Sequence, residues 1–411
     1  MERDLSMRSR RAAPFGAPPG RLWVAALFLL AALALAGCGR ATTAHGASGA
    51  RAVAGGLPAH GDGKTLVATF LDVGQGDSEV VETPSGKTVL IDAGPPGAEQ
   101  TILAFLRARG VQRLDYVVAS HPHEDHIGGM AAVLDALPFG PVIDAAFDVH
   151  HEIQDSCLSA IRSHGARLLR GRAGDHFTID SQVSMDVLAP RNPLFSESDT
   201  DWINNNSVAV RITYGRTRLL FLGDMEAEER QRLYDDGADL RADVLKAAHH
   251  GSRNGTDPDL LARVHPQAVV MSCGAANDYG HPHLQALQAL ESANVPFFRT
   301  DLNGTVSLTC DSEGHVSALP ERTADRERMA TPGGTFGRTG RFNAGHERAR
   351  PTHKPEDSTT GGSASGDVIG NVNSHVYHLP GSRGRLPSPA NRVYFHSAAE
   401  AEAAGYRPAR E

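Results

Sequence analysis

Ten residues, Ser120 to Gly129, constrain this chain more than any other stretch. They read Ser-His-Pro-His-Glu-Asp-His-Ile-Gly-Gly, so three histidines and an aspartate fall within six positions. The apolar run Leu114 to Ala119 before them has the length and β-branching of a buried strand, and apolar residues recur at helical spacing after them. The cluster is therefore predicted on a loop between a strand and a helix, where α/β sheets place their sites.

The spacing of these side chains indicates metal binding. In an extended chain, residues two apart point the same way, so His121 and His123 can share one metal ion. Asp125 and His126 can turn toward a second ion, and paired ions of this kind activate a water and bind a phosphoryl or acyl oxygen. The alternative is a polar loop that holds several histidines, but this number of ligands at this spacing favours metal.

This H-x-H-x-D-H pattern is the hallmark of the metallo-β-lactamase superfamily, and the chain resembles that superfamily beyond the loop. The resemblance implies that Asp224, at the end of a predicted strand, is the carboxylate that bridges both metal ions. It also implies that one histidine of the pair His249 and His250 is the last ligand of the second metal. We favour His250 and keep His249 as the alternative, because the phase of the preceding strand is open.

Four further motifs narrow the resemblance. They are Phe-Leu-Asp-Val-Gly-Gln-Gly-Asp at 70–77, Asn-Asn-Asn-Ser at 204–207, His-His-Gly-Ser at 249–252 and Tyr-Gly-His-Pro-His at 279–283. In this order, and with the histidine loop, they resemble the soluble metallo-β-lactamase-like domain of the ComEC family of bacterial DNA-uptake proteins. The resemblance covers roughly residues 65–319 and implies an α/β fold, a four-layer αβ/βα sandwich of two sheets with helices outside.

The resemblance also implies roles for residues around the ligands. Asp92 would support the histidine loop from behind the ligands, and Asp72 and Asp77 are predicted in the same supporting role. Ser252 is interpreted as a loop hydroxyl near the metals and is a candidate contact of metal or substrate.

Asn206 stands in the region where the superfamily often supplies a third histidine to the first metal. The chain has no histidine from 177 to 248, so any contribution of Asn206 would be a neutral oxygen. Loss of an imidazole weakens a zinc preference, and oxygen ligands favour harder ions such as manganese. The two divalent ions are therefore predicted as zinc or manganese, with manganese favoured for activity. The alternative is that these asparagines cap a turn and touch no metal.

The first 38 residues are predicted to be a bacterial lipoprotein signal peptide. Arginines precede an apolar stretch from Leu22 to Ala36, and Leu-Ala-Gly-Cys at 35–38 resembles a lipidation motif in which Cys38 carries the lipid. The alternative is an uncleaved membrane anchor. With a lipid anchor or with an uncleaved membrane anchor, the rest of the chain is predicted to lie outside the cytoplasmic membrane and to be attached to it. Residues 39–63, which are small and rich in Gly and Ala, are predicted to form a flexible tether.

Three further segments follow. The folded metallo-β-lactamase-like domain is predicted over residues 64–319, and a disordered linker rich in Arg, Gly, Thr and Pro over 320–366. Residues 367–411 resemble a short Ada-type metal-binding module through Leu-Pro-Gly at 379–381 and Arg-Pro at 407–408. That family places cysteine ligands near these motifs, where this chain has Ser382 and Ala409. We therefore expect a small module that has lost its metal site.

The charge of the chain excludes one class of function. The chain carries −8 at pH 7, and five arginines against two acidic residues give the first 38 residues +3, which leaves −11 for residues 39–411. A high-affinity duplex-DNA binder needs a basic footprint that this composition lacks. An enzyme that meets a polyanion transiently through its metal ions is not excluded.

The predicted function is an extracytoplasmic hydrolase with two divalent metal ions that cuts phosphodiesters, with DNA as the favoured substrate. The resemblance implies a metal-bound hydroxide as nucleophile, oriented by Asp125, while His281 or His283 contacts the scissile phosphate or protonates the leaving group. For these two histidines the alternative is a rigid turn before a helix. Two other functions stay open: hydrolysis of phosphorylcholine or another small surface ester, and a surface binding protein without catalysis. No protein partner is inferred.

Overall fold

The computed structural model describes residues 55–145, 147–333, 368–371, 376–379, 392–395, 398 and 406–409. These residues fall into two compact units, divided between residues 341 and 342. The predicted signal peptide with Cys38, and residues 334–366 of the predicted linker, lie outside the described residues. Within the described ranges, every helix is too short or too polar to cross a membrane.

The larger unit contains a mixed sheet of eight strands in the order β15-β14-β1-β2-β3-β4-β5-β6. Neighbouring strands are antiparallel from β15 to β3 and parallel from β3 to β6. All residues of β1, β2 and β3 are buried, which is the pattern of strands covered on both faces. The strands are β1 (Leu66–Phe70), β2 (Glu79–Glu82), β3 (Thr88–Ile91), β4 (Tyr116–Ala119), β5 (Val142–Asp144), β6 (Leu168–Arg170), β14 (Val306–Cys310) and β15 (Val316–Pro320).

The second sheet of this unit has seven strands in the order β13-β12-β11-β10-β9-β8-β7. Its strands are parallel from β13 to β10 and antiparallel from β10 to β7. They are β7 (His176–Thr178), β8 (Val183–Ala189), β9 (Ala209–Tyr214), β10 (Thr217–Phe221), β11 (Val244–Lys246), β12 (Ala268–Met271) and β13 (Phe297–Arg299). Each sheet therefore has a parallel half and an antiparallel half.

Helices connect the parallel strands, as the alternation of strand and helix patterns predicts. The α-helices of the larger unit are α2 (Glu99–Ala108), α3 (Glu124–Ile127), α4 (Met130–Ala136), α5 (Glu152–Ser163), α6 (Trp202–Asn205), α7 (Ala227–Asp235), α8 (Pro258–Val264), α9 (Leu284–Ser292), α10 (Thr300–Asn303) and α11 (Arg326–Met329). A 3₁₀ turn, η1 (Ala248–Gly251), follows β11.

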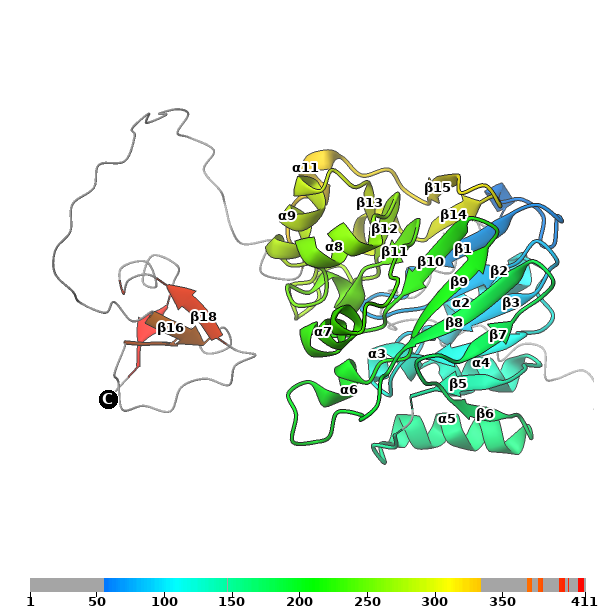
Figure 1. Cartoon of the computed structure of the whole chain (residues 1–411), viewed down its shortest axis with the longest axis horizontal. Coiled ribbons are helices and arrows are strands. Elements are labelled where there is room, and N and C mark those ends of the chain that lie inside the picture. The colour runs from blue at the N-terminus through cyan, green and yellow to red at the C-terminus, as the bar shows by residue number, and fades with distance from the viewer. Residues whose placement is uncertain are drawn as a thin grey trace, which may run out of the picture. The chain divides into compact units, whose positions relative to one another are not determined.

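Three apolar cores lie between the layers of the larger unit. The central core lies between the sheets, where the rings of Phe70 and Phe221 stack with their centroids 6.0 Å apart. A second core joins the first sheet to α2, α4 and α5, and a third joins the second sheet to α7, α8 and α9. Figure 1 shows α7, α8 and α9 on one side of the paired sheets and α4 and α5 on the other. This arrangement confirms the predicted four-layer α/β sandwich.

The parallel halves of the two sheets carry the predicted site residues at their carboxyl ends. Asp92 follows β3, and the histidine loop follows β4. Asp224 follows β10 in the second sheet, and the pair His249 and His250 follows β11. Parallel strands end at one edge of a sheet, which brings segments far apart in the sequence together there.

The folded unit starts before the predicted boundary at residue 64. The ring Nδ1 of His60 lies 2.7 Å from Glu82 Oε1, and the carbonyl of Pro58 accepts a 2.7 Å hydrogen bond from Arg109 Nη2. The last residues of the predicted tether therefore pack on the domain, because buried polar groups of the domain bind their backbone and side chains.

The folded unit also continues past the predicted end at residue 319, through β15 and α11 to Gly333. The buried guanidinium of Arg299 donates from Nη1 to the carbonyls of Arg328 at 3.4 Å and Met329 at 3.1 Å. The amide of Gly333 donates to the carbonyl of Pro282 at 3.1 Å. This corrects the predicted linker: residues 320–333 have no apolar periodicity, but they are held through their backbone.

The smaller unit has a sheet of four strands in the order β18-β16-β17-β19. They are β16 (Val368–Asn371), β17 (Val376–His378), β18 (Arg392–Phe395) and β19 (Arg407–Pro408). Val368 and Tyr377 are buried in its small core, and the amide of Ala409 donates to the carbonyl of Tyr377 at 2.8 Å. The predicted small C-terminal module therefore has a sheet of its own.

The contact of Gly333 yields a prediction about the end of the domain. A Cβ at this position would lie 1.8 Å from the carbonyl oxygen of His281, so Gly333→Ala should displace residues 326–333 from the loop at 281–283. We expect faster hydrogen exchange in both segments and a loss of about 1–3 kcal/mol in the free energy of unfolding. Gly55→Ala is the control, because nothing lies within 4 Å of an added Cβ there. Equal exchange rates in the two variants would contradict the packing described.

Candidate metal centre

Four buried side chains from both sheets converge at the carboxyl ends of the parallel strands. Asp77, His126, Asp224 and His250 each offer a ligand atom, and these atoms all lie within 4.8 Å of one another. The structure thus brings together three of the predicted ligands and one residue, Asp77, that was predicted only as a supporting group. These four side chains are called the buried cluster below.

His126 is held by a support behind the histidine loop. Its Nδ1 lies 2.8 Å from Oδ2 of Asp92, which also accepts a 2.6 Å hydrogen bond from the hydroxyl of Ser120. Oδ1 of Asp92 accepts a 2.7 Å hydrogen bond from the amide of Ser120. The carboxylate fixes the ring and the start of the loop together, which leaves Nε2 of His126 pointing toward Asp224.

His250 has an equivalent support, to which both sheets contribute: Asp77 lies between β1 and β2, whereas Lys246 lies in β11 and Ser272 directly follows β12 of the second sheet. Nδ1 of His250 lies 3.0 Å from Oδ1 of Asp77 and 3.0 Å from the carbonyl oxygen of Ser272. The other oxygen of Asp77 lies 2.8 Å from Nζ of Lys246, a side chain that is 1% exposed. Burial alone would lower the pKa of Lys246, but Asp77 and Glu79 raise it. The ammonium is therefore charged and holds the Asp77 carboxylate in place.

Asp224 and Asp125 provide the negative charge of the centre. Asp224 Oδ1 lies 3.2 Å from His126 Nε2, and Asp224 Oδ2 lies 3.4 Å from His250 Nε2. Oδ2 of Asp125 lies 3.1 Å from the same His250 nitrogen. Burial would raise the pKa of Asp224, but His126 and His250 bring it well below the usual carboxyl value, so the side chain is ionised.

His121 and His123 lie beside this group. His121 Nε2 is 2.9 Å from His123 Nδ1 and 4.0 Å from Asp224 Oδ2. Burial, with the neighbouring imidazoles, lowers the pKa of His121 well below its usual value and also lowers that of His123. Both rings are therefore neutral, which is the protonation state in which histidine binds metal.

The structure gives separate positions to the two histidines between which the sequence left a choice. His250 points into the buried cluster, as favoured from the sequence. His249 also reaches Asp224: its Nε2 lies 3.6 Å from Asp224 Oδ2, and its Nδ1 contacts Glu226. Both residues have left-handed backbone conformations, with φ of 48° and 54°, so successive side chains can face the same carboxylate. His249 is thus available to a first metal beside His121 and His123.

The chemistry of the buried cluster fits a divalent metal ion. His126 Nε2 and Asp224 Oδ1 are buried 3.2 Å from each other, and neither forms a hydrogen bond of ordinary geometry with the described residues. Burial of such atoms is costly unless a proton or cation satisfies them. Imidazole nitrogens with carboxylate oxygens suit zinc, iron and manganese. His126, Asp224, Asp125 and His250 would hold one ion, and His121, His123 and His249, with Asp224, would hold another.

Three predicted site residues are placed elsewhere. Asn206 uses its whole amide on the backbone of Phe195: Oδ1 accepts from the amide at 3.0 Å and Nδ2 donates to the carbonyl at 2.8 Å. This is the turn-capping alternative. Ser252 Oγ accepts from the amide of Gly255 at 2.9 Å and so closes the turn that follows η1. Asp72 pairs with Arg322 at 3.3 Å and does not support a ligand.

A cleft of about 290 Å³ opens above the centre. It is lined by Gln75, His123, Glu124, Asp125, Asn204, Asp224, His249, His250, Tyr279 and His281. His281 is therefore placed to meet a substrate. His283 is not among these lining residues: its Nδ1 accepts a 3.1 Å hydrogen bond from the amide of Arg253.

The pKa values of His281 and His283 do not fit the predicted role of protonating the leaving group. Burial, reinforced by His250, lowers the pKa of His281 to about 2, and burial lowers that of His283 to about 4. Neither ring carries a second proton near neutral pH, so neither is a general acid in this state. The neutral ring of His281 can still form a hydrogen bond to a substrate.

Several residues of the centre were not predicted from sequence. Lys246 gives the clearest signal that could have been read, because a lysine within the strand Val244–Lys246 contradicts an otherwise apolar run. Ser207, whose Oγ lies 3.4 Å from His121 Nδ1 and accepts from the amide of Asp224 at 3.3 Å, lies in a recognised motif. Glu226, the partner of His249, has no sequence signal that we can identify.

Two known protein families match parts of this chain. Residues 71–274 match the family described as "Metallo-beta-lactamase superfamily", and residues 363–411 match "Metal binding domain of Ada". The chain has no cysteine after Cys310, so the second match lacks thiolate ligands.

Among curated proteins, the chain is 30% identical over 254 residues to "ComE operon protein 3" of Bacillus subtilis. It is 32% identical over 242 residues to "Competence protein ComA" of Neisseria gonorrhoeae. Each alignment covers 58% of this chain and 32% of the relative, so the chain spans about a third of the length of these relatives.

Solved structures with a similar fold include the metallo-beta-lactamase fold protein YhfI from Bacillus subtilis, with a TM-score of 0.41 and 13% identity over 62% of this chain and 100% of that chain. A long form RNase Z from yeast has a TM-score of 0.37 and 12% identity over 62% of this chain and 43% of that chain.

The two supporting aspartates predicted together, Asp77 and Asp72, give a matched test. Asp77→Asn should weaken metal binding about 10- to 100-fold, because His250 loses its charged partner. Asp72→Asn should leave metal affinity unchanged. The metal affinities of both variants can be measured by titrating the metal-free protein with metal in competition with a chelating dye.

Asp77→Asn also leaves Lys246 buried without its counter-charge, which costs about 3–5 kcal/mol. Adding Lys246→Met should restore thermal stability without restoring metal affinity. Equal metal affinities of the Asp77 and Asp72 variants would show that Asp77 does not position His250.

Proposed function

Because residues 71–274 of this chain belong to the metallo-β-lactamase superfamily, we propose that it is a metal-dependent phosphodiesterase, with DNA as the favoured substrate. The buried cluster at the floor of an open cleft carries the proposal, since its buried nitrogen and oxygen atoms suit a catalytic metal. Divalent ions held there, zinc or manganese, would lower the pKa of a water and polarise a phosphoryl oxygen.

The side chains of the cleft would divide the remaining work. Asp125 lines the cleft and pairs with His250 Nε2 at 3.1 Å, so its free oxygen can orient a water. His281, neutral and buried at the wall of the cleft, can donate or accept a hydrogen bond at the phosphodiester. The relatives with competence names favour DNA as the substrate.

One observation favours a second substrate class. No lysine or arginine is among the described residues that line the cleft, whereas Glu124, Asp125 and Asp224 are acidic. A long polyanion gains little from such a wall. A small phosphodiester, or phosphorylcholine with its cationic end, is therefore the alternative substrate. A binding protein without catalysis is disfavoured by the retained ligands, which would be costly to bury without metal.

The location of the enzyme is also a proposal. The arginine-rich start, the apolar stretch and Cys38 support a lipid anchor that holds the domain outside the cytoplasmic membrane.

Hydrolysis by the full chain reconstituted with zinc or manganese tests the proposal. The substrates are single-stranded DNA, duplex DNA, bis-p-nitrophenyl phosphate and phosphorylcholine. We expect phosphodiester hydrolysis, and we expect Asp224→Asn to reduce it more than about 100-fold, because loss of an outer partner of a ligand alone costs up to that amount. Metal content, measured in parallel, should fall in the same variant.

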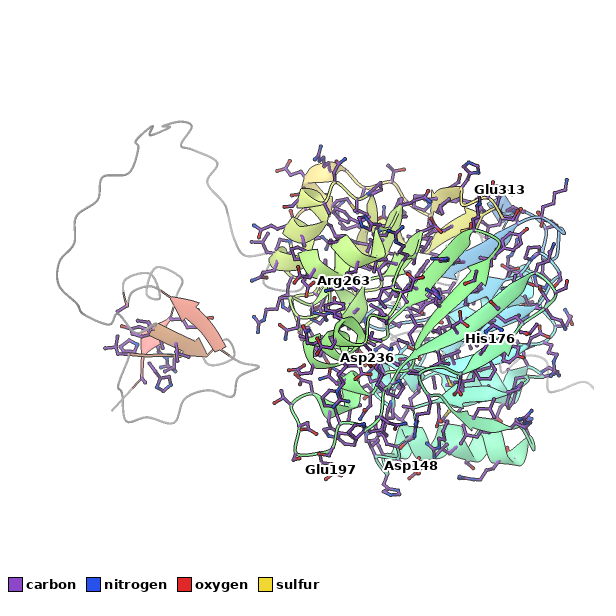
Figure 2. All side chains as sticks on the ribbon, viewed as in Figure 1. Asp148, His176, Glu197, Asp236, Arg263 and Glu313 are labelled. Atoms are coloured by element: carbon purple, nitrogen blue, oxygen red, sulfur yellow. The ribbon has the colours of Figure 1, made fainter. Side chains whose placement is uncertain are left out.

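Asp148→Asn provides the matched control. Asp148 is exposed, lies at the edge of the domain near α5 (Figure 2) and pairs with Arg170 at 2.9 Å, outside the lining of the cleft. The activity of the Asp148→Asn variant should equal that of the unsubstituted protein. Full activity of Asp224→Asn, or hydrolysis of phosphorylcholine alone, would overturn the proposal.

A further inference from the structure

An exposed aromatic ring stands at the wall of the cleft. Tyr279 is 64% exposed. Among the described residues, no other large apolar or aromatic side chain is more exposed. Tyr279 also lines the cleft that contains Asp125 and Asp224. Single exposed aromatic side chains are common on protein surfaces, so exposure alone assigns no role. Tyr279 is distinguished by its place in the lining of the cleft, beside the acidic side chains of the metal centre.

The ring of Tyr279 continues a row of rings that starts at the metal centre. It stacks on His281, with centroids 5.7 Å apart and planes 18° apart. His281 in turn lies 5.3 Å from the ring of His249 and 5.9 Å from that of His250. A flat ligand group that stacked on Tyr279 would therefore lie next to a bond positioned over the centre.

The loop that carries Tyr279 is held in place before any ligand binds. Asn277 Oδ1 accepts from the amides of Tyr279 at 3.1 Å and His281 at 2.9 Å, and its Nδ2 donates to the carbonyl of His281 at 2.6 Å. Gly333 adds its hydrogen bond to Pro282 from the other side. A fixed platform loses little conformational entropy when a ligand stacks on it.

Neutral polar groups complete the wall. Asn204 Oδ1, Gln75 Nε2 and His281 Nδ1 are buried and have no hydrogen-bond partner among the described residues. All three residues line the cleft, and Asn204 and His281 are only 7% and 4% exposed. Gln75 accepts from the amide of Gly274 at 3.1 Å through Oε1, which directs its Nε2 away from that contact. Amide and imidazole groups of this kind bind the edges of nucleobases.

From this wall we infer that Tyr279, with Asn204 and Gln75, forms a subsite for one unpaired nucleobase beside the phosphodiester that is cut. The wall has an aromatic face and neutral hydrogen-bonding groups, and its described residues include no lysine or arginine, so it suits a base better than a phosphate backbone. A base within a duplex is covered on both faces and cannot stack there. The subsite thus selects single strands or frayed ends. This inference rests on the proposed phosphodiesterase activity.

A pair of small substrates isolates the base. Thymidine 5′-(p-nitrophenyl phosphate) and its 3′ isomer share their leaving group with methyl p-nitrophenyl phosphate, which lacks the nucleoside. In the metal-loaded full chain, Tyr279→Ala should raise KM at least about fivefold for one thymidine ester, because base stacking on an aromatic side chain has an effect of this size. It should leave the methyl ester unchanged, and Tyr279→Phe should behave as the unsubstituted protein for all three esters.

A binding measurement without metal separates this inference from the proposed function. Fluorescence anisotropy with EDTA compares labelled oligothymidine with an abasic oligomer of equal length. We expect oligothymidine to bind at least about fivefold more tightly, and Tyr279→Ala to remove that difference. If the unsubstituted protein hydrolyses no phosphodiester but keeps the base preference, only the proposed function fails. The nucleobase subsite is refuted if the methyl ester is hydrolysed but Tyr279→Ala changes neither the KM for the thymidine esters nor the tighter binding of oligothymidine.

Discussion

The organisation of this site depends on one buried carboxylate, Asp224, and on the imidazoles that meet it. His126 and His250 approach its two oxygens at 3.2 Å and 3.4 Å, and His249 lies 3.6 Å away. A carboxylate at 2% exposure is stable only when it is paired, so these contacts are a condition of folding as well as of function. The two sheets must end side by side for the contacts to form, since the histidine loop comes from one sheet and Asp224 from the other.

Local strain and buried support hold this arrangement. Asp92, His249 and His250 have φ values of 54°, 48° and 54°, a region that costs a residue with a side chain about 1–3 kcal/mol. A residue keeps such a backbone conformation only where the surrounding contacts hold it in place. Here the Asp92 carboxylate binds three groups of the histidine loop, and the chain of Lys246 and Asp77 fixes His250. The same scaffold leaves Nε2 of His126 facing Asp224 at 3.2 Å without a hydrogen bond of ordinary geometry among the described residues.

The sequence predicted those parts of the site that are short in sequence and strict in spacing. The histidine loop, Asp224 and His250 could be found because each follows a recognisable apolar strand, and the two-sheet fold follows from the same alternation. Asn206 could not be assigned, because its partner is the backbone of Phe195 in a segment without periodicity. Residues 320–333 were assigned to a linker for a similar reason, since carbonyl groups bound by Arg299 leave no side-chain pattern. Asp72 and Asp77 have the same predicted role, and only tertiary contacts separate them, since Asp77 meets His250 whereas Asp72 pairs with Arg322.

We propose that metal ions bind on the Asp224 carboxylate, between ligands from the two sheets. Anomalous scattering from crystals of the full chain grown with manganese tests it most directly. We expect two peaks in contact with Asp224, one bounded by His126 and His250 and the other by His121 and His123. Metal bound elsewhere, with Asp224 paired only to imidazoles, would show that Asp224 is not a metal ligand.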